Sequence, residues 1–178
     1  MARWIVLLRG INVGSRNRIA MPELRDLLSS AGFEDVRTYL QSGNVVLSAK
    51  GSSEQVAREC ERQIADHFGL DIPAVVRTRA ELAKVVARNP LARVAVDPKR
   101  YQVSFLTGKL GAGVLRKLEA AAVPSEQFVV AGREVYAWHP EGIGRSRLWT
   151  LLAGRGLGVT ATARNWTTVT SLLALADD

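Results

Sequence analysis

Along the first 80 residues, hydrophobic and polar positions alternate in a way that predicts the order strand, helix, strand, strand, helix, strand. Trp4–Leu8 is a continuous apolar run, which is typical of a central strand buried on both faces. Four residues recur with the spacing of a buried helix face: Val56, Cys60, Ile64 and Phe68. The other predicted elements are a helix from Pro22 to Gly32, a helix cap at Ser53, and strands at Val36–Gln41, Val45–Ser48 and Pro73–Thr78.

The second half of the chain approximately repeats this order. Predicted helices lie at Glu81–Ala87, Val114–Ala121, Leu148–Leu152 and Trp166–Leu175, and predicted strands at Tyr101–Thr107, Phe128–Val130 and Glu134–Trp138. The glycine-rich stretch Gly154–Gly158 is expected to lead into the last helix. Because this order is the split βαβ arrangement, we predict an α+β fold of two tandem ferredoxin-like (βαββα-type) lobes. The predicted lobes are residues 1–80 and residues 81–178 with the terminal helix.

Composition is that of a soluble globular protein, with 47% hydrophobic and 23% charged residues. No apolar run approaches the roughly 18 residues of a spanning helix, so no membrane association is expected. The first apolar run ends at Arg9 without a small-residue cleavage site, which argues against a signal peptide. A single cysteine, Cys60, can form no internal disulfide and fits a reducing cytoplasm. Neither a metal nor a cofactor is expected.

The net charge of +7 and the sequence pI near 10.2 point to a polyanionic partner. A second interpretation competes with this one. The basic residues are mostly arginines, they are dispersed, and alanine is abundant, which is also the signature of a high-GC coding bias.

The most site-like stretch is the polar loop Arg9–Arg18, which follows the first strand. In the functional interpretation its glycines let backbone amides approach an anion, and its arginines donate forked hydrogen bonds. In the structural interpretation its asparagines cap turns, an arginine pairs with an acid, and its glycines permit the bend. The residues concerned are Arg9, Gly10, Asn12, Gly14, Arg16 and Asn17.

Three further polar segments offer ligand contacts. On the first hairpin, Gln41, Ser42 and Asn44 are candidate hydrogen-bonding groups and Tyr39 a candidate stacking platform, although a tight turn selects the same residue types. The other two segments lie at predicted helix starts, where capping and core packing are the alternatives to ligand binding. Their candidate residues are Ser146, Arg164, Asn165 and Trp166.

Catalytic residues are sparse in this sequence. Cys60 lies on an apolar helix face and is expected in the core, and His67 follows on the same helix. His139 is the one weak candidate for an acid or base, with no carboxylate at a matching spacing. A Ser-His-Asp arrangement remains open, because such groups meet only in the folded protein.

Five strings of this chain resemble the bacterial family called domain of unknown function 1697. They are RGINVG (Arg9–Gly14), RNRIAM (Arg16–Met21), TYLQSGN (Thr38–Asn44), GIGRS (Gly142–Ser146) and TARNWTTV (Thr162–Val169). The resemblance implies a two-lobed α+β fold with ferredoxin-like pieces and no established activity. Ser15 departs from the family's usual glycine, and arginines replace typical lysines at positions 16 and 18.

The leading hypothesis is that the protein binds a phosphate-bearing or other anionic ligand, with a nucleotide or nucleic acid as examples, in a cleft formed by the Arg9 loop and the C-terminal polar loops. The alternatives are an enzyme acting on a small anionic metabolite between the lobes and a purely structural interaction scaffold. The sequence leaves the oligomeric state open. Candidate ligand-binding residues are Arg9, Asn12, Gly14, Arg16, Asn17, Gln41, Ser42, Asn44, Ser146, Arg164, Asn165 and Trp166.

Overall fold

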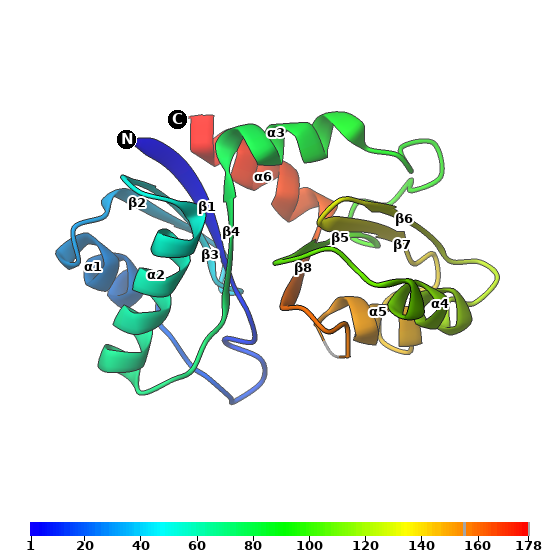
Figure 1. Cartoon of the computed structure of the whole chain (residues 1–178), viewed down its shortest axis with the longest axis horizontal. Helices are drawn as coiled ribbons and strands as arrows, with labels where there is room; N and C mark the ends of the chain where they lie inside the picture. The colour runs from blue at the N-terminus through cyan, green and yellow to red at the C-terminus, as the bar shows by residue number, and fades with distance from the viewer. Residues whose placement is uncertain (155, 178) are drawn as a thin grey trace. The chain divides into compact units, whose positions relative to one another are not determined.

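The computed structural model of the protein describes residues 1–154 and 156–177. The chain divides into two compact units (Figure 1). Unit 1 comprises Met1–Lys84 together with the residues from Ser171 onward, and unit 2 comprises Val85–Thr170. Each unit contains a four-stranded antiparallel sheet, and the strand orders are β2-β3-β1-β4 and β6-β7-β5-β8. The predicted α+β fold of tandem ferredoxin-like lobes is confirmed.

Unit 1 follows the predicted element order. Its strands are β1 (Ala2–Leu8), β2 (Glu34–Tyr39), β3 (Asn44–Ala49) and β4 (Ala74–Thr78). Its helices are α1 (Met21–Ser30) and α2 (Ser53–Phe68), and α3 (Arg79–Arg88) contains residues of both units. Strand β1 is an interior strand, and Trp4 to Leu8 are all at most 5% exposed, as the apolar run predicts.

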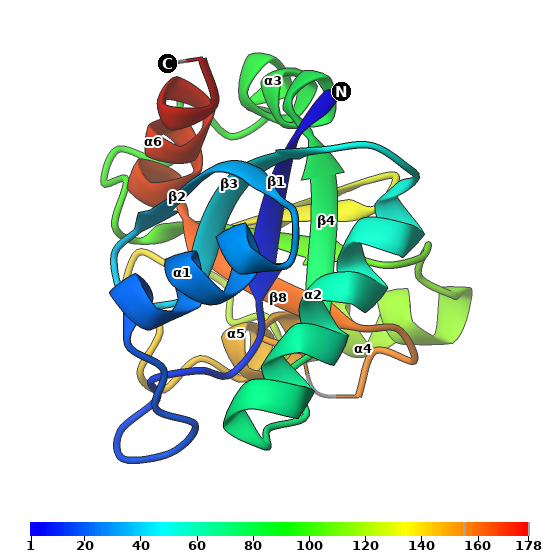
Figure 2. The same cartoon turned by 90° about the vertical axis from the view of Figure 1, so that its left-hand side faces the viewer.

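The core of unit 1 lies between its sheet and helices α1 and α2, which cover the same face of the sheet (Figure 2). Alternate residues of β1, Trp4, Val6 and Leu8, belong to this core because neighbouring side chains of a strand point to opposite faces. The helices contribute residues at helical spacing, including Leu24 and Leu28 of α1. Helix α2 contributes Val56, Cys60 and Ile64.

The predicted cap of α2 is wrong by one residue. Ser52 is the N-cap, and its hydroxyl accepts a hydrogen bond from the backbone N–H of Gln55. The side chain of Gln55 accepts in return from the backbone N–H of Ser52 at 2.8 Å, which completes a capping box. Both serines fit the sequence pattern, but only a cap at Ser52 places Gln55 at the third helical position.

Unit 2 repeats the order of unit 1 with a shorter second helix. Its strands are β5 (Tyr101–Leu106), β6 (Gln127–Ala131), β7 (Glu134–Trp138) and β8 (Ala161–Asn165). Its helices are α4 (Ala112–Ala121) and α5 (Arg147–Leu152), and α6 (Trp166–Asp177) contains residues of both units. The core of unit 2 packs Leu118 of α4 and Leu148 of α5 against sheet residues such as Val135.

Strand β8 was not predicted. The stretch after the glycines was expected to be a polar loop at the start of the last helix, but Ala161–Asn165 pairs antiparallel with β5. The pairing joins residues about 60 positions apart, so no local pattern indicates it. Helix α6 nevertheless begins at the predicted Trp166.

Candidate functional site

The loop from Arg9 to Arg18, called loop 9–18 below, connects β1 to the segment before α1. Four of its residues have a positive φ: Gly10 (71°), Asn12 (53°), Gly14 (59°) and Asn17 (50°). Glycine and asparagine are the residues that adopt this conformation most readily. The backbone path of the loop therefore explains its glycine and asparagine content.

Asparagine side chains brace loop 9–18 from inside. The Asn12 amide donates to the carbonyl oxygens of Ile19 (2.9 Å) and Gln41 (2.7 Å), and its oxygen accepts from Ile19 N (2.9 Å). The Asn17 amide donates to Gly10 O at 3.0 Å. Asn12 thus uses both amide hydrogens within the protein, and these contacts are those of the structural interpretation.

The turn between β2 and β3, residues 40–43, lies against the end of β1 and beside loop 9–18. Leu8 N donates to Gly43 O at 2.8 Å, and the Asn12 bond to Gln41 joins the loop to the turn. The Asn44 amide is fully buried and donates to Tyr39 O and Ser42 Oγ, both at 2.8 Å. Of the predicted ligand-binding residues here, Gln41 and Ser42 are exposed and Asn44 holds the turn.

The cationic side chains of loop 9–18 differ in their surroundings. Arg9 is half-buried and interacts with other residues, whereas Arg16, Arg18 and Gly14 are exposed. Within the described part of the chain, the guanidinium groups of Arg16 and Arg18 form neither an ion pair nor a hydrogen bond. Residues 1–22 contain no Asp or Glu, so no acid within this segment offsets these charges.

In unit 2, Ser146 joins a buried polar network with Glu126 and His139. The Ser146 hydroxyl accepts from Trp149 N at 3.0 Å, which caps α5, and donates to Glu126 Oε2 at 2.6 Å. His139 Nδ1 lies 2.5 Å from the same carboxylate oxygen. Val123 N donates to the other oxygen, Oε1, at 3.1 Å. These hydrogen bonds join segments of the chain between Val123 and Trp149 that are far apart in sequence.

The network favours the ionised form of Glu126. Burial opposes ionisation, but the hydrogen bonds from Ser146 and His139 outweigh it and lower the pKa of the Glu126 carboxyl. Sequence reasoning missed Glu126, because it lies 13 and 20 residues from its two partners and no motif marks it.

Ser146, His139 and Glu126 do not form the relay of a serine hydrolase. In that relay the serine hydroxyl hydrogen-bonds to Nε2 of the histidine, and the carboxylate of the acid hydrogen-bonds to Nδ1. Here Ser146 Oγ lies 3.3 Å from Nδ1, the nitrogen that also faces the acid. His139 is fully buried, and its Nε2 has no hydrogen-bond partner among the described residues. The network therefore supports the loop that carries GIGRS, which lines a cavity of about 460 Å³ with Glu126.

The predicted residues around Arg164 lie on β8 and at the start of α6. Arg164 is a buried strand residue that donates to Thr162 Oγ1 (2.8 Å) and Ala163 O (2.9 Å), and burial lowers its pKa to about 10. Asn165 Oδ1 accepts from Thr168 N at 2.9 Å, the expected cap of the last helix. Trp166 stacks on Tyr101 with ring centroids 4.8 Å apart.

Within each unit, the structure brings some of the predicted residues together. Loop 9–18 and the turn at residues 40–43 are neighbours in unit 1, and Ser146 meets His139 in unit 2. Over residues 1–154 and 156–177, no three His, Cys, Asp or Glu side chains are grouped as a metal site requires. None of the helices described is both long enough and apolar enough to span a bilayer.

Two tandem ferredoxin-like lobes of this kind define the class of protein, and the sequence comparison then gives the family. The chain belongs to the family described as Protein of unknown function (DUF1697), whose model matches residues 1–136. Its fold is similar to that of the conserved bacterial protein SP0830 from Streptococcus pneumoniae. That match has a TM-score of 0.80 and 24% sequence identity, and it covers 98% of each chain. No curated protein matches this chain.

Proposed function

We propose that the protein binds a phosphate-bearing polyanion, such as single-stranded nucleic acid, through loop 9–18. The observation that carries this proposal is the pair Arg16 and Arg18, exposed and without an ion pair among the described residues, on a loop whose backbone is braced by Asn12 and Asn17. A guanidinium group held by a braced loop loses less entropy when it binds phosphate.

The surroundings of the loop favour an anion over other ligands. No acid occurs in residues 1–22, and the chain as a whole carries a net charge of +7. The exposed Gln41 and Ser42 of the neighbouring turn supply hydrogen-bonding groups beside the arginines. In this proposal Asn12 positions the loop, and Arg16 and Arg18 contact the ligand.

Arg16→Ala/Arg18→Ala should weaken binding of a fluorescently labelled single-stranded oligonucleotide, measured by fluorescence anisotropy over a series of salt concentrations. For the unchanged protein, log affinity should fall linearly with log salt, because bound cations release counterions from the strand. Loss of two phosphate contacts should make that slope shallower by roughly one to two. Competition with inorganic phosphate and with a nucleotide then shows whether a single phosphate group is enough for binding at loop 9–18.

The matched control is Arg25→Ala/Arg116→Ala, which removes the same charge from exposed helix positions outside the loop. Its affinity should stay within about threefold of the unchanged protein, since surface charges outside the binding loop act only through the screened overall field. The proposal fails if the oligonucleotide does not bind even at low salt, or if both double variants lose the same affinity.

A further inference from the structure

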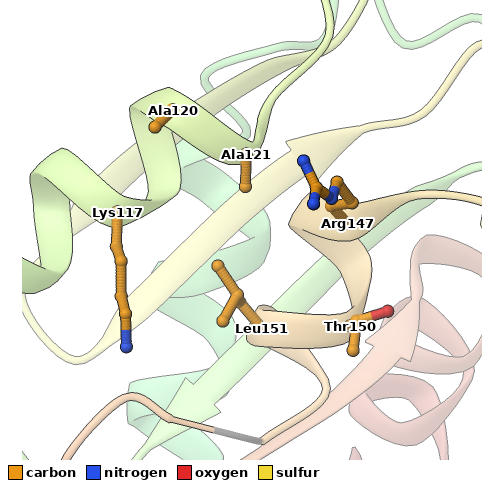
Figure 3. A pocket seen from close by; sticks show the side chains of 6 residues that line it. All are labelled: Lys117, Ala120, Ala121, Arg147, Thr150 and Leu151. Carbon is orange, nitrogen blue, oxygen red and sulfur yellow. The ribbon is translucent and has the colours of Figure 1, made fainter.

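A second hollow lies in unit 2 between α4 and α5, well apart in sequence from loop 9–18 (Figure 3). Its volume is about 400 Å³, within the range of small-molecule sites. Each helix contributes three lining residues with the same spacing, one cation followed by two residues three and four positions on. They are Lys117, Ala120 and Ala121 of α4, and Arg147, Thr150 and Leu151 of α5.

This spacing places each set of three on one helix face, so the hollow follows from the sequence of both helices. The apolar surface comes from Ala120, Ala121 and Leu151, and the two alanines are too short to fill the space. Leu118 of α4 and Leu148 of α5 are fully buried in the core of unit 2. The helices are therefore held in place by core residues that do not line the hollow, and the hollow does not depend on a ligand to form.

Both charged residues that line the hollow are cations. Figure 3 shows Lys117 and Arg147 extending from the two different helices, with the Leu151 side chain between them. Among the described residues, Lys117 Nζ makes one hydrogen bond, a long contact of 3.4 Å to Gly156 O. The guanidinium of Arg147 is exposed and has no hydrogen bond or ion pair with any residue that the structure describes. No acid is among the residues that line the hollow.

We infer that this hollow binds a small organic acid that has an apolar body and a carboxylate group. The apolar body removes the surface of Ala120, Ala121 and Leu151 from water, which is the main source of binding energy in a site of this kind. The carboxylate accepts charge-assisted hydrogen bonds from Arg147, and Lys117 adds positive charge at another part of the hollow. A neutral ligand would leave both cations without a partner, and a cationic one would be repelled.

Octanoate is the test ligand, with octanol and octylamine as neutral and cationic analogues of the same chain length. Binding is followed by calorimetry and by NMR shifts of the α4 and α5 amides. Octanoate should bind about tenfold more tightly than octanol, and octylamine should not bind measurably. The amide chemical-shift changes that octanoate causes should be largest at the six lining residues.

Two variants and one control locate the site. Arg147→Gln, a substitution at an exposed position that should leave the fold intact, should weaken the binding of octanoate about tenfold. Ala121→Leu fills the hollow and should weaken the binding of octanoate and octanol alike. Arg116→Gln removes a neighbouring charge of α4 that does not line the hollow and should leave affinity within about twofold.

Equal affinity for octanoate and octanol in the unchanged protein would overturn the inference, as would absence of saturable octanoate binding. Equal losses of octanoate affinity in Arg147→Gln and Arg116→Gln would also overturn it, because they would show only a general attraction of the anion to positive charge. Arg16→Ala/Arg18→Ala should bind octanoate normally, so this inference and the polyanion proposal can fail separately.

Discussion

At the scale of single residues, Gly43 has the least room of the glycines near loop 9–18. Its φ is +86°, and a Cβ there would lie 2.7 Å from Leu8 Cβ and 2.9 Å from Ile11 Cδ1. Leu8 and Ile11 are both buried, so neither can move away easily. Gly43→Ala should therefore lower the free energy of unfolding by about 2–5 kcal/mol, measured by urea denaturation.

Gly10→Ala is the matched control for this prediction. Gly10 has a similar φ of +71°, but no atom lies within 4 Å of the position its Cβ would take. Only the backbone penalty of about 1–2 kcal/mol should remain. If the two variants lost equal stability, the close approach of the turn to β1 would be wrong.

Residue roles were only partly predictable from the sequence. The glycine and asparagine pattern located loop 9–18 and allowed for asparagines that brace it, which is what Asn12 and Asn17 do. The surroundings of Arg164 were not predictable, because they depend on its place in a strand that pairs with β5. The partnership of His139 with Glu126 was hidden for a similar reason, since it forms only when the β6–β7 hairpin closes.

At the scale of elements, the start of α2 tests which serine caps the helix. Ser52 exchanges hydrogen bonds with Gln55 across the first turn, whereas the hydroxyl of Ser53 makes only an exposed contact of 3.3 Å to Glu54. Ser52→Ala should lower the free energy of unfolding by about 1 kcal/mol in urea denaturation. Ser53→Ala should change it by less than about 0.5 kcal/mol. The opposite ranking would restore Ser53 as the cap.

The success of the element predictions followed the strength of each local pattern. Helix α2 has buried residues at regular spacing and a cap, and strand β1 is a continuous apolar run, so both were predicted. Strand β8 has only five residues, ATARN, including a buried arginine that reads as polar. Its strand conformation is stabilised by pairing with the distant β5, and this contribution is absent from any local window.

At the scale of the whole molecule, the two sheets have the same topology, because the order β2-β3-β1-β4 in unit 1 corresponds strand by strand to the order β6-β7-β5-β8 in unit 2. The sequence indicated this repeat through element order alone, since α2 has 16 residues and α5 only six. The units also differ in the buried acids that lose a proton only in alkali. Unit 1 contains Cys60, and unit 2 contains Tyr101 and Tyr136.

These buried acids predict that stability falls in alkali. Burial raises the pKa of Cys60 from 9.0 to about 12 and that of Tyr101 from 10.0 to about 12, and it also raises the pKa of Tyr136. At these three groups the unfolded chain binds fewer protons than the folded protein in that range, so their contribution to the free energy of unfolding decreases as pH rises. Arg164, whose pKa burial lowers to about 10, acts in the opposite direction above that pH. The contribution of Cys60 is fully present below about pH 9 and is lost towards about pH 12.

Urea denaturation at several pH values between about 8 and 11 measures this decline. Cys60→Ala should lower stability at every pH because it leaves a cavity, yet its pH profile above about 9 should be shallower, by at most about 1.4 kcal/mol per pH unit. Comparing slopes separates the loss of the titrating thiol from the loss of packing. An unchanged slope in Cys60→Ala would mean that the thiol ionises as easily in the folded protein as in the unfolded chain, which contradicts its burial between α2 and the sheet.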